Sequence, residues 1–130
     1  MNRPPKLNED VAERRRREDE SPRLLAVVPR LKTMRLELSE SRGEESQVEN
    51  TQIKRIALDH APSVFMIPCG ERRCKHGSYD LTSTLLAGLR RGETQIECSD
   101  TCYGEVGTAR CGRVMKCIAY AEYADETPIA

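Results

Sequence analysis

The segment VFMIPCGERRCKHG, residues 64–77 of a chain of 130 residues, joins an apolar run to two cysteines. Apolar residues 64–67 have the length of a short buried strand. Gly70 and Gly77 give the backbone freedom to wrap around an ion. We therefore expect a strand followed by a turn that holds two thiols, those of Cys69 and Cys74.

A second pair of cysteines, Cys102 and Cys111, brackets a turn with two glycines that leads into the last apolar segment. Two glycine-bearing loops with two thiols each favour a tetrahedral four-thiolate site for Zn²⁺. The predicted metal ligands are Cys69, Cys74, Cys102 and Cys111. We name the loops 69–77 and 102–111 the first and second knuckle.

The arrangement of the two knuckles resembles a zinc ribbon that has a helix inserted between them. In zinc sites of this kind about two to four residues usually separate the paired ligands. Here four residues separate Cys69 from Cys74 and eight separate Cys102 from Cys111. A closed four-thiolate site leaves no open coordination position for water, which indicates a structural zinc ion rather than a catalytic one.

The alternatives to metal binding are three disulfides or unligated thiols. Residues 1–20 contain no apolar stretch typical of a secretory signal, and 18 apolar residues never run together. We therefore expect a cytoplasmic protein without a membrane segment. Because the cytoplasm keeps thiols reduced, metal binding explains six cysteines better than disulfides do.

The other two cysteines, Cys98 and Cys117, are expected to fill space in the core, since a free cysteine packs as a small apolar residue. Two alternatives stay open. Cys98 and Cys102 can form the second ligand pair, or His76 can replace a thiolate. An isolated histidine in a loop is more often only an exposed side chain.

Residues 64–107 also resemble the thioredoxin-like [2Fe-2S] ferredoxins, through Cys69, Gly77, a leucine-rich helix and the Cys98-x3-Cys102-Tyr103-Gly104 sequence. The resemblance implies a cluster held by four thiolates, the last two in a Cys-x3-Cys pair, and a redox role. The chain differs in the short separation of Cys69 and Cys74 and in the lack of a Gly-Pro after the second pair. A redox protein is therefore an alternative function.

Periodicity predicts an α+β domain over residues 33–124 with a small, mainly antiparallel sheet. Met34, Leu36 and Leu38 alternate with charged residues as in a half-buried strand, and residues 52–59 supply its hairpin partner across a polar loop at 39–50. Residues 80–91 form an amphipathic helix that Gly92 ends. Further strands are expected at 94–98 and 113–123.

The remaining parts of the chain are terminal segments. Residues 1–32 are expected to be a charged arm, partly disordered or helical, because the first 20 residues have no apolar face. Ser21 and Pro22 are typical of a helix start, which predicts a short helix at 24–28. Residues 125–130 are expected to be a tail.

The charge is balanced, with 21 basic and 21 acidic residues, which argues against a protein built wholly to bind nucleic acid. A local patch is still expected, and its residues are Arg72, Arg73, Lys75, Arg90 and Arg91. No HExxH, GxSxG or phosphate-binding loop occurs, so neither an enzyme nor a small-molecule substrate is indicated. We expect a zinc-containing binding or regulatory module that contacts nucleic acid, or alternatively a protein adaptor.

Overall fold

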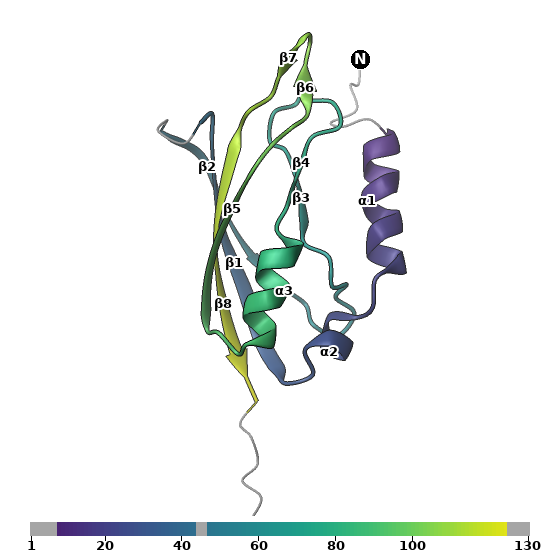
Figure 1. Ribbon diagram of the computed structural model, residues 1–130, viewed down its shortest axis with the longest axis vertical. Coiled ribbons are helices and arrows are strands. Elements are labelled where there is room, and N and C mark those ends of the chain that lie inside the picture. Colours follow the sequence, from purple (N-terminus) through teal and green to yellow (C-terminus); the bar gives the residue numbers. More distant parts are fainter. Residues whose placement is uncertain (1–7, 44–46, 125–130) are drawn as a thin grey trace, which may run out of the picture.

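The computed structural model describes residues 8–43 and 47–124, and the tail predicted at 125–130 lies outside this part. Four strands form an antiparallel sheet in the order β2-β1-β8-β5 (Figure 1). Their bounds are β1 Leu31–Ser41, β2 Val48–Arg55, β5 Gln95–Thr101 and β8 Val114–Tyr123. The predicted α+β class with a mainly antiparallel sheet is confirmed.

The predicted alternation in β1 sets which side chains face the core. Met34, Leu36 and Leu38 are buried, and Arg35 and Glu37 between them are half-buried on the other face. The long strand β8 lies beside β1 and continues this pattern. Leu36 is opposite Ala119, and Leu38 is opposite Cys117.

A second layer covers the apolar face of the sheet (Figure 1). It consists of the hairpin of β3 (Met66–Pro68) and β4 (Ser78–Asp80), together with helices α2 (Leu24–Val27) and α3 (Thr82–Arg90). The fully buried large side chains of this layer are Leu24, Tyr79, Leu81, Leu85 and Leu89. The core therefore lies between the sheet and this layer.

Helix α3 lies within the range 80–91 predicted for it. Asp80 precedes the helix and its Oδ1 accepts a hydrogen bond of 3.1 Å from the backbone N–H of Thr82. Gly92 follows the C-cap residue Arg91 and adopts φ +75°, which only glycine does without steric cost. Leu85 and Leu89 form the buried stripe.

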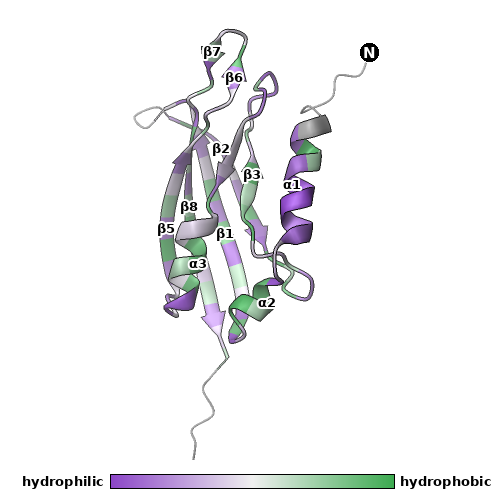
Figure 2. Cartoon of the chain, turned by 45° about the vertical axis from the view of Figure 1, so that its right-hand side comes forward, coloured by the Kyte–Doolittle hydropathy of each residue, from purple (hydrophilic) through white to green (hydrophobic). Residues whose placement is uncertain are grey.

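The N-terminal region contains two helices. Helix α1, Asn8–Glu20, is polar apart from Val11 and Ala12 and stands beside β3 and β4 (Figures 1 and 2). Ser21 does not cap the second helix as predicted, because its Oγ donates instead to the carbonyl of Glu18 at 2.8 Å. Leu24 and Val28 lie in the core, so residues of the predicted 1–32 segment pack with the predicted 33–124 domain.

The polar stretch 39–50, predicted as a loop, is in part strand. β1 continues to Ser41 and β2 begins at Val48, with a bulge after Glu40. Glu40 and Ser41 are buried although they are polar. The carboxylate of Glu40 accepts hydrogen bonds from the second layer, which compensate for its burial. No helix among the described residues is long and apolar enough to span a membrane.

Candidate metal centre

The Sγ atoms of Cys69, Cys74, Cys102 and Cys111 all lie within 4.8 Å of one another. Cys69 and Cys111 are 3.6 Å apart, and so are Cys74 and Cys102. A tetrahedral Zn²⁺ site with Zn–S distances of about 2.3 Å separates its sulfurs by about 3.8 Å. The cluster therefore has the size that one four-coordinate ion requires.

Two loops bring these sulfurs together from distant parts of the chain. The first knuckle connects β3 to β4, and the second connects β5 to β8 and carries the small hairpin of β6 (Glu105–Val106) and β7 (Ala109–Arg110). Lys75 and Glu105 exchange two backbone hydrogen bonds of 2.7 and 2.9 Å. The two knuckles are thus joined through backbone as well as through the cysteines.

Backbone N–H groups point at a sulfur of each knuckle. The N–H of Glu71 donates to Sγ of Cys69, and the N–H of Gly104 donates to Sγ of Cys102, both at 3.4 Å. The donor follows the cysteine by two residues in each case. Such donors favour the thiolate over the thiol and orient a metal ligand.

Two glycines make room for the sulfurs. A Cβ atom on Gly77 would overlap Sγ of Cys74 and Sγ of Cys102, and one on Gly104 would overlap Sγ of Cys74 and the backbone of Lys75. Neither glycine is needed for a left-handed turn, since the positive-φ glycines are elsewhere. Gly77 and Gly104 are therefore required by the close approach of backbone to the sulfur cluster.

The pKa is raised for two of the four thiols, those of Cys74 and Cys102. Burial raises the pKa of Cys74 to about 12, with the neighbouring sulfurs of Cys69 and Cys111 adding to the effect. The pKa of Cys102 is raised as well, by its contact with Cys69 and by burial. A bound cation would neutralise the charge of thiolates that this site otherwise disfavours.

Cys98 and Cys117 lie outside this cluster. They face each other across β5 and β8, with Cys117 buried in the core and Cys98 packed against it. Contact with Cys117 lowers the pKa of Cys98, and contact with Cys98 raises that of Cys117. All six cysteines are in the described part of the chain and none forms a disulfide there. The sheet therefore pairs Cys98 with Cys117. The ferredoxin resemblance implies instead a pair of Cys98 with Cys102.

His76 is also separate from the ligand set. It has φ 60°, and its backbone N–H and ring Nδ1 contact the carboxylate of Asp10 in α1 at 2.8 and 2.9 Å. This contact links α1 to the residue that lies two positions after Cys74. His76 thus serves as an anchor for α1.

The five basic residues predicted as a patch lie in two places. Arg72, Arg73 and Lys75 are exposed on the first knuckle. Arg90 and Arg91 lie at the end of α3, where β5 begins, whereas the second knuckle lies at the other end of β5 (Figure 1). The structure therefore brings together only the three residues of the first knuckle.

Sequence reasoning missed the buried carboxylate of Glu40 behind the two knuckles. It accepts hydrogen bonds from Tyr79 (2.6 Å), from the N–H of Gly70 (2.8 Å) and from Asn50 (3.2 Å), and Nε of Arg113 lies 3.3 Å away. Burial opposes ionisation most strongly, but these partners together lower the pKa of Glu40. Glu40 is surrounded by polar residues in the sequence, so no local pattern marks it as buried.

No protein-family model, curated protein or solved structure matches this chain. The chemistry of the centre therefore follows from its own donor atoms. Four thiolates are soft ligands that select Zn²⁺ or iron over Mg²⁺ and Ca²⁺. If all four bind one ion, no coordination position remains for water or substrate.

Proposed function

We propose that Cys69, Cys74, Cys102 and Cys111 bind one structural Zn²⁺ ion, and that the protein is a small zinc-stabilised binding module with zinc-ribbon-like knuckles. The observation that carries the proposal is the convergence of four sulfurs, from two hydrogen-bonded knuckles, within 4.8 Å of one another. A closed four-thiolate site supports a structural rather than a catalytic role. Persistent thiols also fit a reducing compartment, and we place the protein in the cytoplasm.

Zinc would supply stability that the core is poorly able to supply. The chain has one Phe and no Trp, so the side chains that bury the most apolar surface are nearly absent. A structural zinc ion contributes an apparent ~10–16 kcal/mol to folding, against a net stability of roughly 5–15 kcal/mol for a typical domain. Removal of the ion is therefore expected to abolish cooperative folding.

The sulfur geometry favours a single ion over a [2Fe-2S] cluster. In such a cluster two irons bridged by sulfides lie between the two pairs of cysteine sulfurs, which places the pairs further apart than the ligands of one ion. Here every pair of sulfurs is within 4.8 Å. Colour distinguishes the two, because a zinc protein is colourless and an iron–sulfur protein is brown.

Metal analysis tests the proposal directly. Protein purified without added metal should contain about one zinc per chain by elemental analysis and by native mass spectrometry. A strong chelator should remove the zinc and the cooperative unfolding transition together. A metal-free protein that unfolds cooperatively, or one with three disulfides by mass, would contradict the proposal.

Nucleic-acid binding is a second candidate, and the exposed cations of the first knuckle favour it. Arg72, Arg73 and Lys75 lie within four consecutive positions beside the proposed zinc ion. Contacts to phosphates would make the affinity fall steeply with salt, with a slope of about 0.9 per phosphate on duplex DNA.

The separation of the basic residues supplies a matched control. Arg72→Glu with Arg73→Glu should reduce the salt slope by about one or two contacts and leave the zinc content unchanged. Arg90→Glu with Arg91→Glu, at the far end of β5, should leave the slope unchanged. If neither DNA nor RNA binds at low salt, nucleic-acid binding is wrong and the protein-adaptor function replaces it as the second candidate.

A further inference from the structure

We propose that the free edge of β2 binds an extended segment of a partner protein, which adds a fifth strand to the sheet. Its residues on the core side would be mainly apolar, and acidic residues would lie beside Lys54 and Arg55. The proposal rests on β2 and the groove beside it, and it is independent of the metal centre. It names a partner chemistry that the metal proposal leaves open.

The first observation is the open edge itself. β2 is the last strand in the order β2-β1-β8-β5 and pairs only with β1 in the described part of the chain. The N–H of Ile56 donates to the carbonyl of Met34 at 3.0 Å, so the backbone of Ile56 faces β1. Backbone direction alternates along a strand. Arg55, Ile53 and Thr51 therefore direct their N–H and C=O groups toward the open edge.

The second observation is the exposure of the whole strand. All eight residues of β2 are exposed, including Val48 at 56% and Ile53 at 59%. These two are among the most exposed large apolar side chains of the described residues. An exposed strand edge of this kind is the template on which peptides bind by strand addition.

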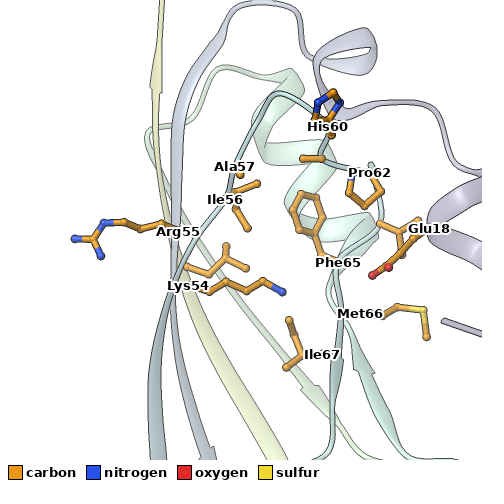
Figure 3. A pocket seen from close by; sticks show the side chains of 13 residues that line it. Glu18, Lys54, Arg55, Ile56, Ala57, His60, Pro62, Phe65, Met66 and Ile67 are labelled. Carbon is orange, nitrogen blue, oxygen red and sulfur yellow. The ribbon is translucent and has the colours of Figure 1, made fainter. Parts of the chain in front are cut away.

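The third observation is an apolar groove beside this edge, with a cavity volume of about 410 Å³. It lies between the core-facing side of the sheet and β3, and Leu36, Ile56, Phe65 and Ile67 contribute to its walls (Figure 3). Side chains of an added strand alternate between the two faces of a sheet. Those on the core side would enter this groove, which selects apolar residues there.

The fourth observation is the charge of the rim. Lys54 extends into the groove and Arg55 points away from it (Figure 3). Neither has an acidic side chain at ion-pair distance among the described residues, and Glu18 of α1 lies at the opposite wall of the groove. Arg55 thus favours an acidic residue on the outer face of the added strand, and Lys54 favours an acidic group at the mouth of the groove.

Selection from a random library of displayed peptides as long as β2, on the folded chain of 130 residues, tests the proposal. We expect enriched peptides to have apolar residues at alternate positions together with acidic residues that pair with Lys54 and Arg55. On binding, the amide hydrogens of Thr51, Ile53 and Arg55 should become protected from exchange. No enrichment, or protection at another surface, would overturn the proposal.

A matched pair of variants isolates the backbone contact. Ile53→Pro removes an N–H that faces the edge and leaves the ladder to β1 intact, whereas Ile53→Ala removes only the side chain. Selected peptides should bind Ile53→Pro about tenfold more weakly than Ile53→Ala. Equal affinities would overturn strand addition, with the circular dichroism spectrum of each variant reporting whether it is folded.

Charge reversal provides a second test, which holds even if the proline variant fails to fold. Lys54→Glu with Arg55→Glu should reduce the affinity for the selected peptides about tenfold or more at low salt, and by less at high salt. An unchanged affinity would contradict the acidic partner. A concentration-dependent dimer of the free protein, with the same three amides protected, would mean that a second copy of the chain occupies the edge.

Discussion

The hydroxyl of Tyr79 donates a hydrogen bond of 2.6 Å to the carboxylate of Glu40, and both side chains are buried. The same carboxylate accepts the N–H of Gly70, next to Cys69, and pairs with Arg113, two residues after Cys111. One residue of β1 therefore connects both knuckles to the sheet. An ionised carboxylate is stable in the interior only when its oxygens are satisfied in this way.

Glu40→Gln should reduce the free energy of unfolding by roughly 1.5–3 kcal/mol, the value of hydrogen bonds to a charged group. A larger loss is not expected, because Arg113 keeps its 2.7 Å contact with Glu49. Denaturant titration measures the change. Glu37→Gln on the half-buried outer face is the control and should cost less than about 1 kcal/mol, the value of an exposed ion pair such as its 3.3 Å pair with Arg35. Equal costs at the two positions would contradict the role of Glu40.

The stability that Glu40 contributes should depend on pH in one direction. Because its pKa is lowered in the folded protein from the ordinary 4.5, the folded state binds fewer protons near that pH. The contribution is complete above pH 4.5 and is lost as the pH falls through the folded pKa. The difference in unfolding free energy between the wild type and Glu40→Gln should therefore be constant from neutral pH down to about 5 and shrink below it. A difference in unfolding free energy that grows as the pH falls would contradict this prediction.

The elements that local patterns determine were predictable. The alternation of Met34, Leu36 and Leu38 predicted β1, and the leucine stripe with Gly92 predicted α3. These signals lie within a few residues of one another. The pairing of β1 with β8, which fixes the middle of the sheet, depends on contacts between opposite ends of the chain. Periodicity says which face of a strand is buried but not which strand lies beside it.

The candidate site shows the same division. Spacing and glycines indicated the four cysteines that the fold brings together. The core position of Cys98 was predictable from the alternating pattern of its strand. Its position opposite Cys117 depends on the register of β5 with β8, which the pattern does not report. The separation of Arg72 and Arg73 from Arg90 and Arg91 depends on the direction of α3 and β5, which charge patterns do not report.

The cysteines should divide into two groups on substitution. Serine at position 69, 74, 102 or 111 should abolish stoichiometric zinc, because each replacement removes one of four ligands. Cys98→Ala and Cys117→Ala should keep the zinc and cost about 1–2 kcal/mol each, as small truncations in the core. Native mass spectrometry and denaturant titration measure the two effects. Loss of zinc in Cys98→Ala would mean that the second knuckle is assigned wrongly.

Gly77→Ala and Gly104→Ala should each prevent zinc binding. The added methyl group would occupy the space of the Cys74 sulfur, and neither the sulfur nor the neighbouring backbone can move without opening the cluster. Gly107→Ala is the matched control. It has open space around it but φ +63°, so it should cost about 1–2 kcal/mol of backbone strain and leave zinc bound. Elemental analysis of the three variants checks the prediction, which fails if Gly77→Ala retains a full equivalent of zinc.

Removal of the N-terminal segment should have an effect that depends sharply on where the chain is cut. Helix α1 is held by polar contacts such as Asp10 with His76 and the 3.6 Å pair of Arg17 with Asp80, and exposed ion pairs contribute about 0–1 kcal/mol. A chain that begins at residue 21 should therefore keep its thermal midpoint within about 8 °C. A chain that begins at residue 33 also loses Leu24, Val28 and Leu31 from the core, each worth about 1.5–3 kcal/mol, and should not unfold cooperatively. Thermal unfolding of the two truncated proteins checks both outcomes, and a similar loss in the two would show that α1 itself stabilises the domain.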